Sequence, residues 1–321
     1  MTRAGKEMDI SVVIPVYNER ENIRPLYEAL KKVMTGLGRE YEIIFVDDGS
    51  ADGTLTVLEE IQASDKTLAV LSMRRNFGQT AAIAAGFDFS RGDYIVTMDG
   101  DLQNDPEDIP MLLRMAADAD VVSGWRKDRK DPLFSRRLPS MAANWLISRV
   151  TGVKLHDYGC SLKVYRKEVV KNLRLYGDMH RFIPAVASWF GVRVVEAEVR
   201  HHPRTRGKSK YGISRTLRVV LDLLTVKFLQ SFSTRPIQFF GPLGLACGFI
   251  GFLISLYLTV QKLVMGASIG GRPLLLLGVL LIILGVQIIG MGLIGEILVR
   301  VYHESQRKPV YVLKKVIGPE P

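Results

Sequence analysis

The segment Tyr94–Pro106 reads YIVTMDGDLQNDP, a short β-rich apolar run that ends in two aspartates, Asp99 and Asp101. Two earlier segments have the same design: Ile10–Glu19 reads ISVVIPVYNE and Tyr41–Ser50 reads YEIIFVDDGS. Continuous apolar runs, without polar alternation, are typical of parallel strands covered on both faces. The stretches between the runs have a helical pattern. The sequence therefore predicts an α/β domain with a mostly parallel sheet and helices on both faces.

Strands and helices alternate from residue 10 to residue 125 in this prediction. Strands are expected at 10–15, 41–47, 68–72, 94–98 and 121–124, and helices at 21–35, 54–63, 79–90 and 107–117. Ligands of such sheets bind beyond the carboxyl ends of the strands. Three of these ends are acidic, at Glu19, at Asp47 with Asp48, and at Asp99 with Asp101. Turns and helix caps explain one acidic pair, but three acidic ends on one rim favour a site for Mg²⁺ or Mn²⁺.

Composition and missing motifs narrow the class of protein. The chain has 321 residues, 47% of them apolar and only two of them cysteine, which excludes disorder and a disulfide scaffold. Its net charge of +10 is unevenly distributed, because residues 1–120 carry −10 and residues 121–235 carry +16. No G-x-G-x-x-G turn follows the first predicted strand, which disfavours a dehydrogenase, and no P-loop motif is present, which excludes a P-loop NTPase. The five histidines show no zinc-site spacing.

Two long apolar stretches near the C-terminus predict membrane helices. Residues 236–261 and 273–295 contain no charged side chain and no histidine, and about 20 helical residues cross a bilayer core. The linker between them carries only Lys262 and Arg272, whereas the outer flanks are strongly basic. The positive-inside rule therefore places both flanks, and the soluble part, in the cytoplasm. The charged first ten residues do not resemble a signal peptide.

The segment before the first span predicts an amphipathic helix over residues 213–235. Apolar residues recur there at helical spacing: Ile213, Leu217, Val220, Leu221, Leu224 and Phe228. This helix is expected either at the membrane interface or packed on the soluble domain. The expected organisation is a catalytic domain at 1–212, this helix, spans at 236–261 and 273–299, and a cytoplasmic tail at 300–321.

Glycines form faces on both predicted spans. Gly278, Gly285 and Gly292 are spaced by seven residues, and Gly244 and Gly248 by four. Small residues let helices approach closely in lipid. The faces therefore predict pairing of helices, either within the chain or between copies in a homo-oligomer.

Seven motifs resemble a known family. ISVVIPVYNE (10–19), FVDDGSADGT (45–54), RNFG (75–78) and MDGDLQNDP (98–106) resemble the family 2 glycosyltransferases of the GT-A fold. SGWR (123–126), DYGCSLKVY (157–165) and RTRGKSKY (204–211) resemble the polyisoprenyl-phosphate hexose synthases, above all the bacterial bactoprenol glucosyltransferases and the related formamido-arabinose transferases. The resemblance covers about residues 8–300 and implies an enzyme of the bacterial inner membrane.

The resemblance also implies roles for particular residues. The expected ligands of the donor nucleotide are Pro15, Tyr17, Glu19, Asp48, Asp99 and Gly100. The expected metal ligands are Asp99, Asp101 and Gln103, which would hold Mg²⁺ or Mn²⁺. The expected ligands of the lipid phosphate are Arg126, Arg136 and Ser140, and a mobile loop would add Arg204 and Lys210. Asp157, Asp101 and Arg126 are expected to be catalytic.

Two positions depart from the family pattern. Many relatives have alanine where this chain has Gly100, and Ser-Gly-Phe-Arg where it has Gly159–Lys163. Neither departure removes a ligand, but both leave the choice of sugar open.

The resemblance predicts one inverting transfer of a hexose from a nucleotide sugar, with UDP-glucose as donor, to undecaprenyl phosphate. A phosphate monoester is already ionised at pH 7, so it needs no strong base. The Gln-x-x-Arg-Trp motif of processive synthases is absent, which favours a single transfer. Alternatives are another donor (GDP-mannose or UDP-formamido-arabinose), another acceptor such as a diacylglycerol lipid or a sugar hydroxyl with Asp157 as base, or an inactive two-span scaffold. No nucleic acid partner is expected.

Overall fold

The structure is a computed structural model, and it describes residues 8–127, 147–149, 151–173, 175, 179–188, 191–203, 237–266, 272–305 and 310–319. The chain divides into two compact units. The globular unit comprises Met1–Val226 and Pro309–Pro321, and the helical unit comprises Lys227–Lys308. The amphipathic helix expected at 213–235 lies outside the described residues.

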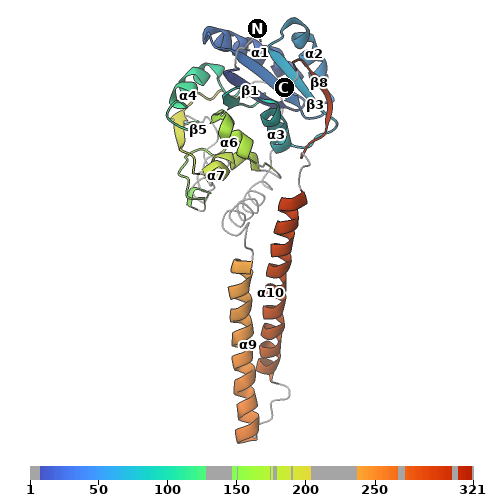
Figure 1. Ribbon diagram of the computed structural model, residues 1–321, viewed down its shortest axis with the longest axis vertical. Helices are drawn as coiled ribbons and strands as arrows, with labels where there is room; N and C mark the ends of the chain where they lie inside the picture. Colours follow the sequence, from blue (N-terminus) through green and yellow to red (C-terminus); the bar gives the residue numbers. More distant parts are fainter. Residues whose placement is uncertain are drawn as a thin grey trace, which may run out of the picture. The chain divides into compact units, whose positions relative to one another are not determined.

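One mixed sheet forms the centre of the globular unit (Figure 1). Its strands are β1 (Ile10–Val16), β2 (Tyr41–Asp47), β3 (Leu68–Met73), β4 (Tyr94–Thr97), β5 (Val121–Trp125), β6 (Lys163–Arg166), β7 (Val194–Glu198) and β8 (Leu313–Ile317). Their spatial order is β7-β5-β6-β4-β1-β2-β3-β8. Strands β1 to β4 pair in parallel, as do β5 and β7, whereas β6 and β8 pair antiparallel to their neighbours. The prediction of a mostly parallel sheet is confirmed.

Helices connect the strands as the alternating pattern predicts. They are α1 (Arg20–Gly36), α2 (Thr54–Ser64), α3 (Gln79–Phe89), α4 (Ile109–Met115), α6 (Lys167–Asn172) and α7 (Ile183–Ser188), with short 3₁₀ turns η1 (Pro106–Asp108) and η3 (Met179–Arg181). The five predicted strands and the predicted helices agree with the structure to within about two residues at their ends. The exception is the last helix, which begins with η1 and continues as α4.

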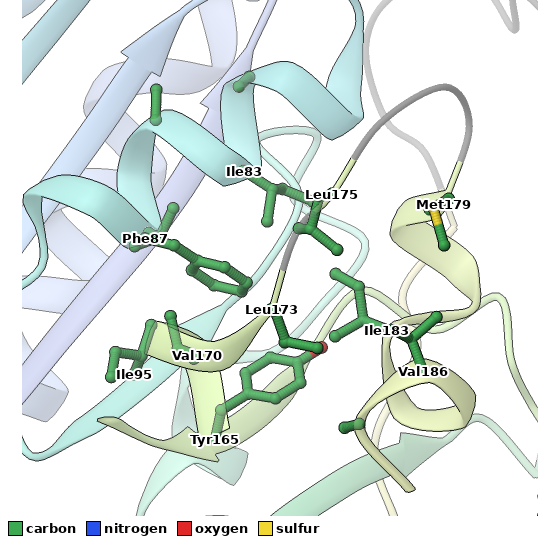
Figure 2. Close-up of a cluster of buried hydrophobic side chains, with 14 of the residues drawn as sticks. Ile83, Phe87, Ile95, Tyr165, Val170, Leu173, Leu175, Met179, Ile183 and Val186 are labelled. Carbon is green, nitrogen blue, oxygen red and sulfur yellow. The ribbon is translucent and has the colours of Figure 1, made fainter. Parts of the chain in front are cut away.

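Each face of the sheet carries its own apolar core. Alternate residues of β1 point to opposite faces, so Val12 and Ile14 pack with α1 and α2, whereas Val13 packs with α3. Figure 2 shows the second core, where α3, β6, α6 and the η3–α7 segment meet. Phe87 and Tyr165 pack edge to face there, with ring centroids 5.6 Å apart. This covering on both faces explains the continuous apolar runs in the sequence.

The last strand, β8, comes from the segment that was expected to be a tail. It pairs antiparallel with β3, with Leu71 opposite Val316. Just before it, the Tyr311 hydroxyl donates to Asp88 at 2.8 Å, and within it Lys315 pairs with Glu59 at 2.9 Å. The chain therefore leaves the globular unit, forms the helical unit and then returns to the same sheet.

The described residues of the helical unit form two helices, α9 (Ile237–Met265) and α10 (Pro273–Ser305). Both are long and apolar enough to cross a membrane, and only 17% and 11% of their most apolar windows are buried. Helices of a soluble core would be mostly buried, so this exposure favours spans. Glycines line the contact between the helices, because a Cβ on Gly285 would lie 2.6 Å from the Gly244 carbonyl oxygen and 2.7 Å from the Gly248 amide nitrogen. The predicted pairing of glycine faces thus occurs within the chain.

Candidate functional site

The loops that follow β1 and β2 are joined by hydrogen bonds. The Asn18 amide donates to Ser50 Oγ, and Asn18 Oδ1 accepts from the Ala51 amide, both at 2.9 Å. The Glu19 amide donates to Thr54 Oγ1 at 3.0 Å. Asn18 has a φ of 54°, a left-handed conformation that asparagine tolerates better than most residues. These bonds hold the first two strand ends together as one rim.

Three residues predicted to bind the donor lie along this part of the rim. Tyr17 is 36% exposed, and Pro15 is partly buried at the end of β1. The Glu19 carboxylate accepts from the Asn22 side-chain amide at 2.6 Å, so it also holds the first turn of α1. The structure places all three beside the loop after β2.

Asp48 joins the loop after β2 to the RNFG motif after β3. Its two carboxylate oxygens accept from the backbone amides of Phe77 and Gly78 at 2.7 and 2.9 Å. Burial raises the pKa of this carboxyl, although the two amides oppose the rise. The neighbouring Gly49 has a φ of 73°, and a Cβ there would lie 2.6 Å from the backbone of Arg75. The side chain of Asp48 therefore fixes the loop that leads into α3.

The next residue along, Gln79, is a site residue that sequence reasoning missed. It is the first residue of α3, and its side-chain amide donates to Asp99 Oδ1 at 2.7 Å. A glutamine at the start of a helix does not by itself indicate a binding site, and only the folded structure shows that Gln79 contacts Asp99. Through Asp48, the RNFG loop and Gln79, contacts run from the end of β2 to the end of β4.

The Asp-x-Asp loop, Asp99–Gln103, is tightly built. Asp101 is 8% exposed, and its Oδ1 accepts from the Gln103 amide at 3.2 Å. Leu102 has a φ of 62°, a strained conformation for a bulky residue that costs about 1–3 kcal/mol. A Cβ on Gly100 would lie 2.6 Å from Val16 Cγ1, which explains why glycine fits between these aspartates. The sequence departure at Gly100 is thus accommodated by local packing.

The two aspartates suit a cation that is shared with a substrate. Burial raises the pKa of Asp99, and the nearby Asp101 carboxylate raises it further. A divalent cation would relieve that repulsion. Among the described residues, no group of three or more His, Cys, Asp or Glu side chains is arranged to hold a metal by itself. Mg²⁺ usually binds one or two carboxylates together with substrate phosphates, so Asp99, Asp101 and Gln103 fit this mode.

A buried ion pair joins the SGWR and DYGCSLKVY motifs. Arg126 Nε and Nη2 donate to the two oxygens of Asp157 at 2.7 and 3.0 Å, and the Arg126 amide donates at 3.3 Å. The side chains are only 14% and 4% exposed. Burial opposes the charge of the guanidinium, but Asp157 raises the pKa of Arg126 overall. Asp157 therefore holds Arg126 in one orientation, a role that the sequence left open.

A second buried cation lies close to this pair. Lys163 is 2% exposed, and its ammonium donates to the carbonyl oxygens of Cys160 and Tyr158. Burial lowers the pKa of Lys163. The positive charges of Arg126 and Lys163 both oppose the rise in the pKa of Asp99, so these cations and the Asp-x-Asp loop share one electrostatic environment. The structure thus brings Asp99, Asp101, Arg126 and Asp157 together.

Four predicted site residues lie outside the described residues: Arg136, Ser140, Arg204 and Lys210. The chain that leads to Arg204 is described up to Pro203. There the His202 amide donates to the Gln103 carbonyl at 2.9 Å, and Arg200 pairs with Asp105 and Asp108 at 3.2 and 3.0 Å. The last described residues before the basic stretch therefore lie beside the Asp-x-Asp loop.

Comparisons with known proteins agree with this architecture. Residues 11–174 match the family described as Glycosyl transferase family 2. The chain is 46% identical, over 97% of its length and 94% of the relative's, to a dodecaprenyl-phosphate galacturonate synthase of Rhizobium johnstonii. It is 40% identical, over 97% of its length and 91% of the relative's, to an undecaprenyl-phosphate 4-deoxy-4-formamido-L-arabinose transferase of Pseudomonas aeruginosa.

A solved structure shares the fold of the globular unit. Glucosyl-3-phosphoglycerate synthase from Mycobacterium tuberculosis, solved with Mn²⁺ and UDP, superimposes with a TM-score of 0.52 at 19% identity. The match covers 70% of this chain and 81% of that one. At this identity the likeness concerns the fold alone.

Proposed function

This chain belongs to glycosyl transferase family 2, and on that basis we propose that it is a membrane-bound transferase that moves one sugar from a nucleotide sugar to a polyprenyl phosphate. The observation that carries the proposal is the buried Arg126–Asp157 pair beside the Asp-x-Asp loop. It provides an oriented guanidinium for one anion and carboxylates for a cation that binds another. Two anionic substrates require such an arrangement, because they repel each other. The inactive-scaffold alternative offers no reason for this pair.

The chemical step is a displacement at the anomeric carbon. An oxygen of the lipid phosphate forms the new bond, the bond from that carbon to the diphosphate oxygen breaks, and the electron pair leaves with the nucleoside diphosphate. The configuration of the sugar inverts. The phosphate monoester has a second pKa of about 6, so it attacks as an anion and no residue has to remove a proton. Asp157 is therefore a partner of Arg126 and not a base.

Each side chain of the site has a distinct task in this step. Arg126 binds the acceptor phosphate, for which the planar guanidinium is suited, and Asp157 fixes its orientation. A divalent cation held by Asp99, Asp101 and Gln103 would stabilise the charge that develops on the leaving diphosphate. Arg136 and Ser140 are proposed to add contacts to the acceptor, and Arg204 and Lys210 to the phosphates.

The nucleotide is proposed to bind along the rim formed by the loops after β1 and β2. Pro15, Tyr17 and Glu19 would contact it directly, together with Gly100 of the Asp-x-Asp loop. Asp48 would act chiefly through the RNFG loop, because both of its oxygens already accept backbone amides.

The comparisons change the expected sugar of the donor. The sequence resemblance favoured UDP-glucose, but the relatives at 46% and 40% identity are named for galacturonate and for 4-deoxy-4-formamido-L-arabinose. These names favour the alternative of another donor. We therefore propose galacturonate as the sugar, because the relative at 46% identity carries that name. Formamido-arabinose is the second candidate, supported by the relatives at 40% identity.

The membrane arrangement follows from the course of the chain. Two spans return a chain to the side of the membrane from which it came, and β8, which follows α10, pairs within the same sheet as β1 to β7. The basic flanks favour the cytoplasmic side of a bacterial inner membrane. The proposed division is a catalytic domain at 1–212 that β8 completes, a juxtamembrane helix at 213–235, and the two spans. Pairing of chains in a homo-oligomer stays a prediction.

A donor panel tests the proposal. Purified full-length protein is incubated with undecaprenyl phosphate, Mn²⁺ or Mg²⁺, and labelled UDP-galacturonate, UDP-4-deoxy-4-formamido-L-arabinose, UDP-glucose or GDP-mannose. We expect label to enter the organic phase with UDP-galacturonate and to stay out after EDTA treatment. Label from another donor alone would overturn the sugar assignment. Label from no donor would overturn the proposed function.

A further inference from the structure

Glu196 on β7 is an acidic residue that holds the backbone of the loop carrying Asp157. Its Oε1 accepts from the amides of His156 and Asp157 at 2.7 and 3.1 Å. Its Oε2 lies 2.8 Å from His156 Nδ1, and because a carboxylate only accepts, that nitrogen is the donor. One side chain therefore makes three hydrogen bonds to two consecutive residues, one of which is Asp157.

The position of Glu196 in the sheet makes this contact rigid. Strand β7 pairs in parallel with β5, and Glu196 lies opposite Ser123, three residues before Arg126. The side chain of Glu196 is 12% exposed. Arg126 follows the last residue of β5, whereas Asp157 lies in a loop that needs an anchor. Glu196 connects that loop to the strand beside the one that carries Arg126.

A stacking contact joins the same two segments. The rings of Trp125 and His156 stack with centroids 4.4 Å apart and an interplanar angle of 19°. Trp125 precedes Arg126 and His156 precedes Asp157, so the stack and the ion pair connect neighbouring residues of the same two segments. Glu196 orients the His156 ring and thereby supports both connections.

We propose that Glu196 is a positioning residue for sugar transfer, which acts by fixing Asp157 and, through it, the guanidinium that binds the acceptor phosphate. This inference rests on the proposed function. A residue of this kind acts on the acceptor side alone, because Gln79 and the Asp-x-Asp loop are supported by other contacts. Losing it displaces Arg126 without removing any group that contacts a substrate.

Two substitutions of Glu196 test the proposal kinetically. Glu196→Ala removes all three hydrogen bonds, and we expect kcat/KM for undecaprenyl phosphate to fall about 10- to 100-fold. The KM for the nucleotide sugar should stay within about twofold, because the donor side is held by other contacts. Glu196→Gln keeps an oxygen for the two backbone amides, so it should recover to within about threefold of the wild type.

The matched control is Glu198→Ala. Glu198 lies two residues along the same strand and on the same face, but it is 57% exposed and pairs with Lys127 at the surface. We expect wild-type kinetics from it, within about twofold. The proposal is overturned if Glu196→Ala behaves like Glu198→Ala, or if Glu196→Gln is as impaired as Glu196→Ala.

Hydrogen exchange of the intact protein provides a readout that does not depend on activity. The amides of His156 and Asp157 should exchange at least about tenfold faster in Glu196→Ala than in the wild type. Their exchange rates in Glu198→Ala should equal those of the wild type. Equal exchange in the wild type and both variants would overturn the proposed positioning role of Glu196, even if the enzyme is active. If the wild type labels no lipid, the proposed function fails, and exchange still decides whether Glu196 holds the loop.

Discussion

The Arg126–Asp157 pair allows the role of Asp157 to be tested by a double-mutant cycle. If Asp157 acts only by orienting Arg126, then its removal matters little once Arg126 is gone. We expect Asp157→Ala to lower kcat/KM for undecaprenyl phosphate about 100-fold, which is about 2.7 kcal/mol of transition-state stabilisation. Arg126→Ala should cost at least as much, and the double variant should be within about threefold of Arg126→Ala.

The burial of the pair predicts a parallel effect on stability. With side chains 14% and 4% exposed, each single variant leaves a buried charge without its partner. This costs about 3–5 kcal/mol of unfolding free energy, whereas the double variant regains part of the loss. Thermal unfolding in detergent measures this. Arg126→Lys is a further control, because it keeps the charge but loses the bidentate contact.

One outcome refutes the reasoning. If Asp157 is a general base, its removal costs about 10²- to 10⁴-fold independently of Arg126. The two single effects would then multiply in the double variant. Multiplicative losses would also revive the alternative of a hydroxyl acceptor, because only such an acceptor needs its proton removed.

Three further predictions concern other parts of the molecule. Asp101→Ala should lower transfer at least about 10³-fold, as EDTA should, and Mn²⁺ or Mg²⁺ should restore only the EDTA-treated wild type; an unchanged rate would exclude the metal role. Gln79→Leu should raise the metal concentration for half-maximal transfer about tenfold, whereas equal metal dependence would show that the contact with Asp99 has no such function. Asp65→Asn should lose about 2–3 kcal/mol of stability at pH 7, measured by chemical unfolding.

The pH dependence of that last effect has a definite sign. Burial raises the pKa of Asp65, but hydrogen bonds from Lys31 and Tyr27, both at 2.6 Å, outweigh it and lower the pKa below the ordinary value. A lowered folded-state pKa stabilises the protein above the unfolded pKa of about 3.9. The difference between wild type and Asp65→Asn should therefore be constant from pH 7 to about pH 5 and shrink below pH 4. A difference that grows on acidification would contradict the assignment.

The fold could be predicted largely because its strands are buried on both faces. Runs such as Ile10–Val16 and Tyr41–Asp47 are mostly apolar and almost entirely buried, and this marks central parallel strands. The strand β8 was missed for a physical reason. The edge strand β8 reads LKKVI and packs on one neighbour only, so neither length nor composition distinguishes it from a tail.

The site divides in the same way. Motif positions indicated Asp99, Asp101, Arg126 and Asp157, which the structure brings together. Gln79 and Glu196 could not be found from sequence, because each acts on a segment far away in the chain: Gln79 on Asp99, 20 residues on, and Glu196 on His156, 40 residues back. The partner of Asp157 could not be predicted from the sequence either, since only the structure shows that both of its carboxylate oxygens accept from Arg126.

The central claim, that a lipid phosphate oxygen attacks the anomeric carbon, is tested most directly by the mass of the products. Purified enzyme is given undecaprenyl phosphate and the active nucleotide sugar, and lipid and nucleotide are both measured by mass spectrometry. We predict a lipid monophosphate that carries one sugar and an equimolar nucleoside diphosphate. A lipid diphosphate sugar with release of nucleoside monophosphate would show attack at phosphorus, and would contradict the account.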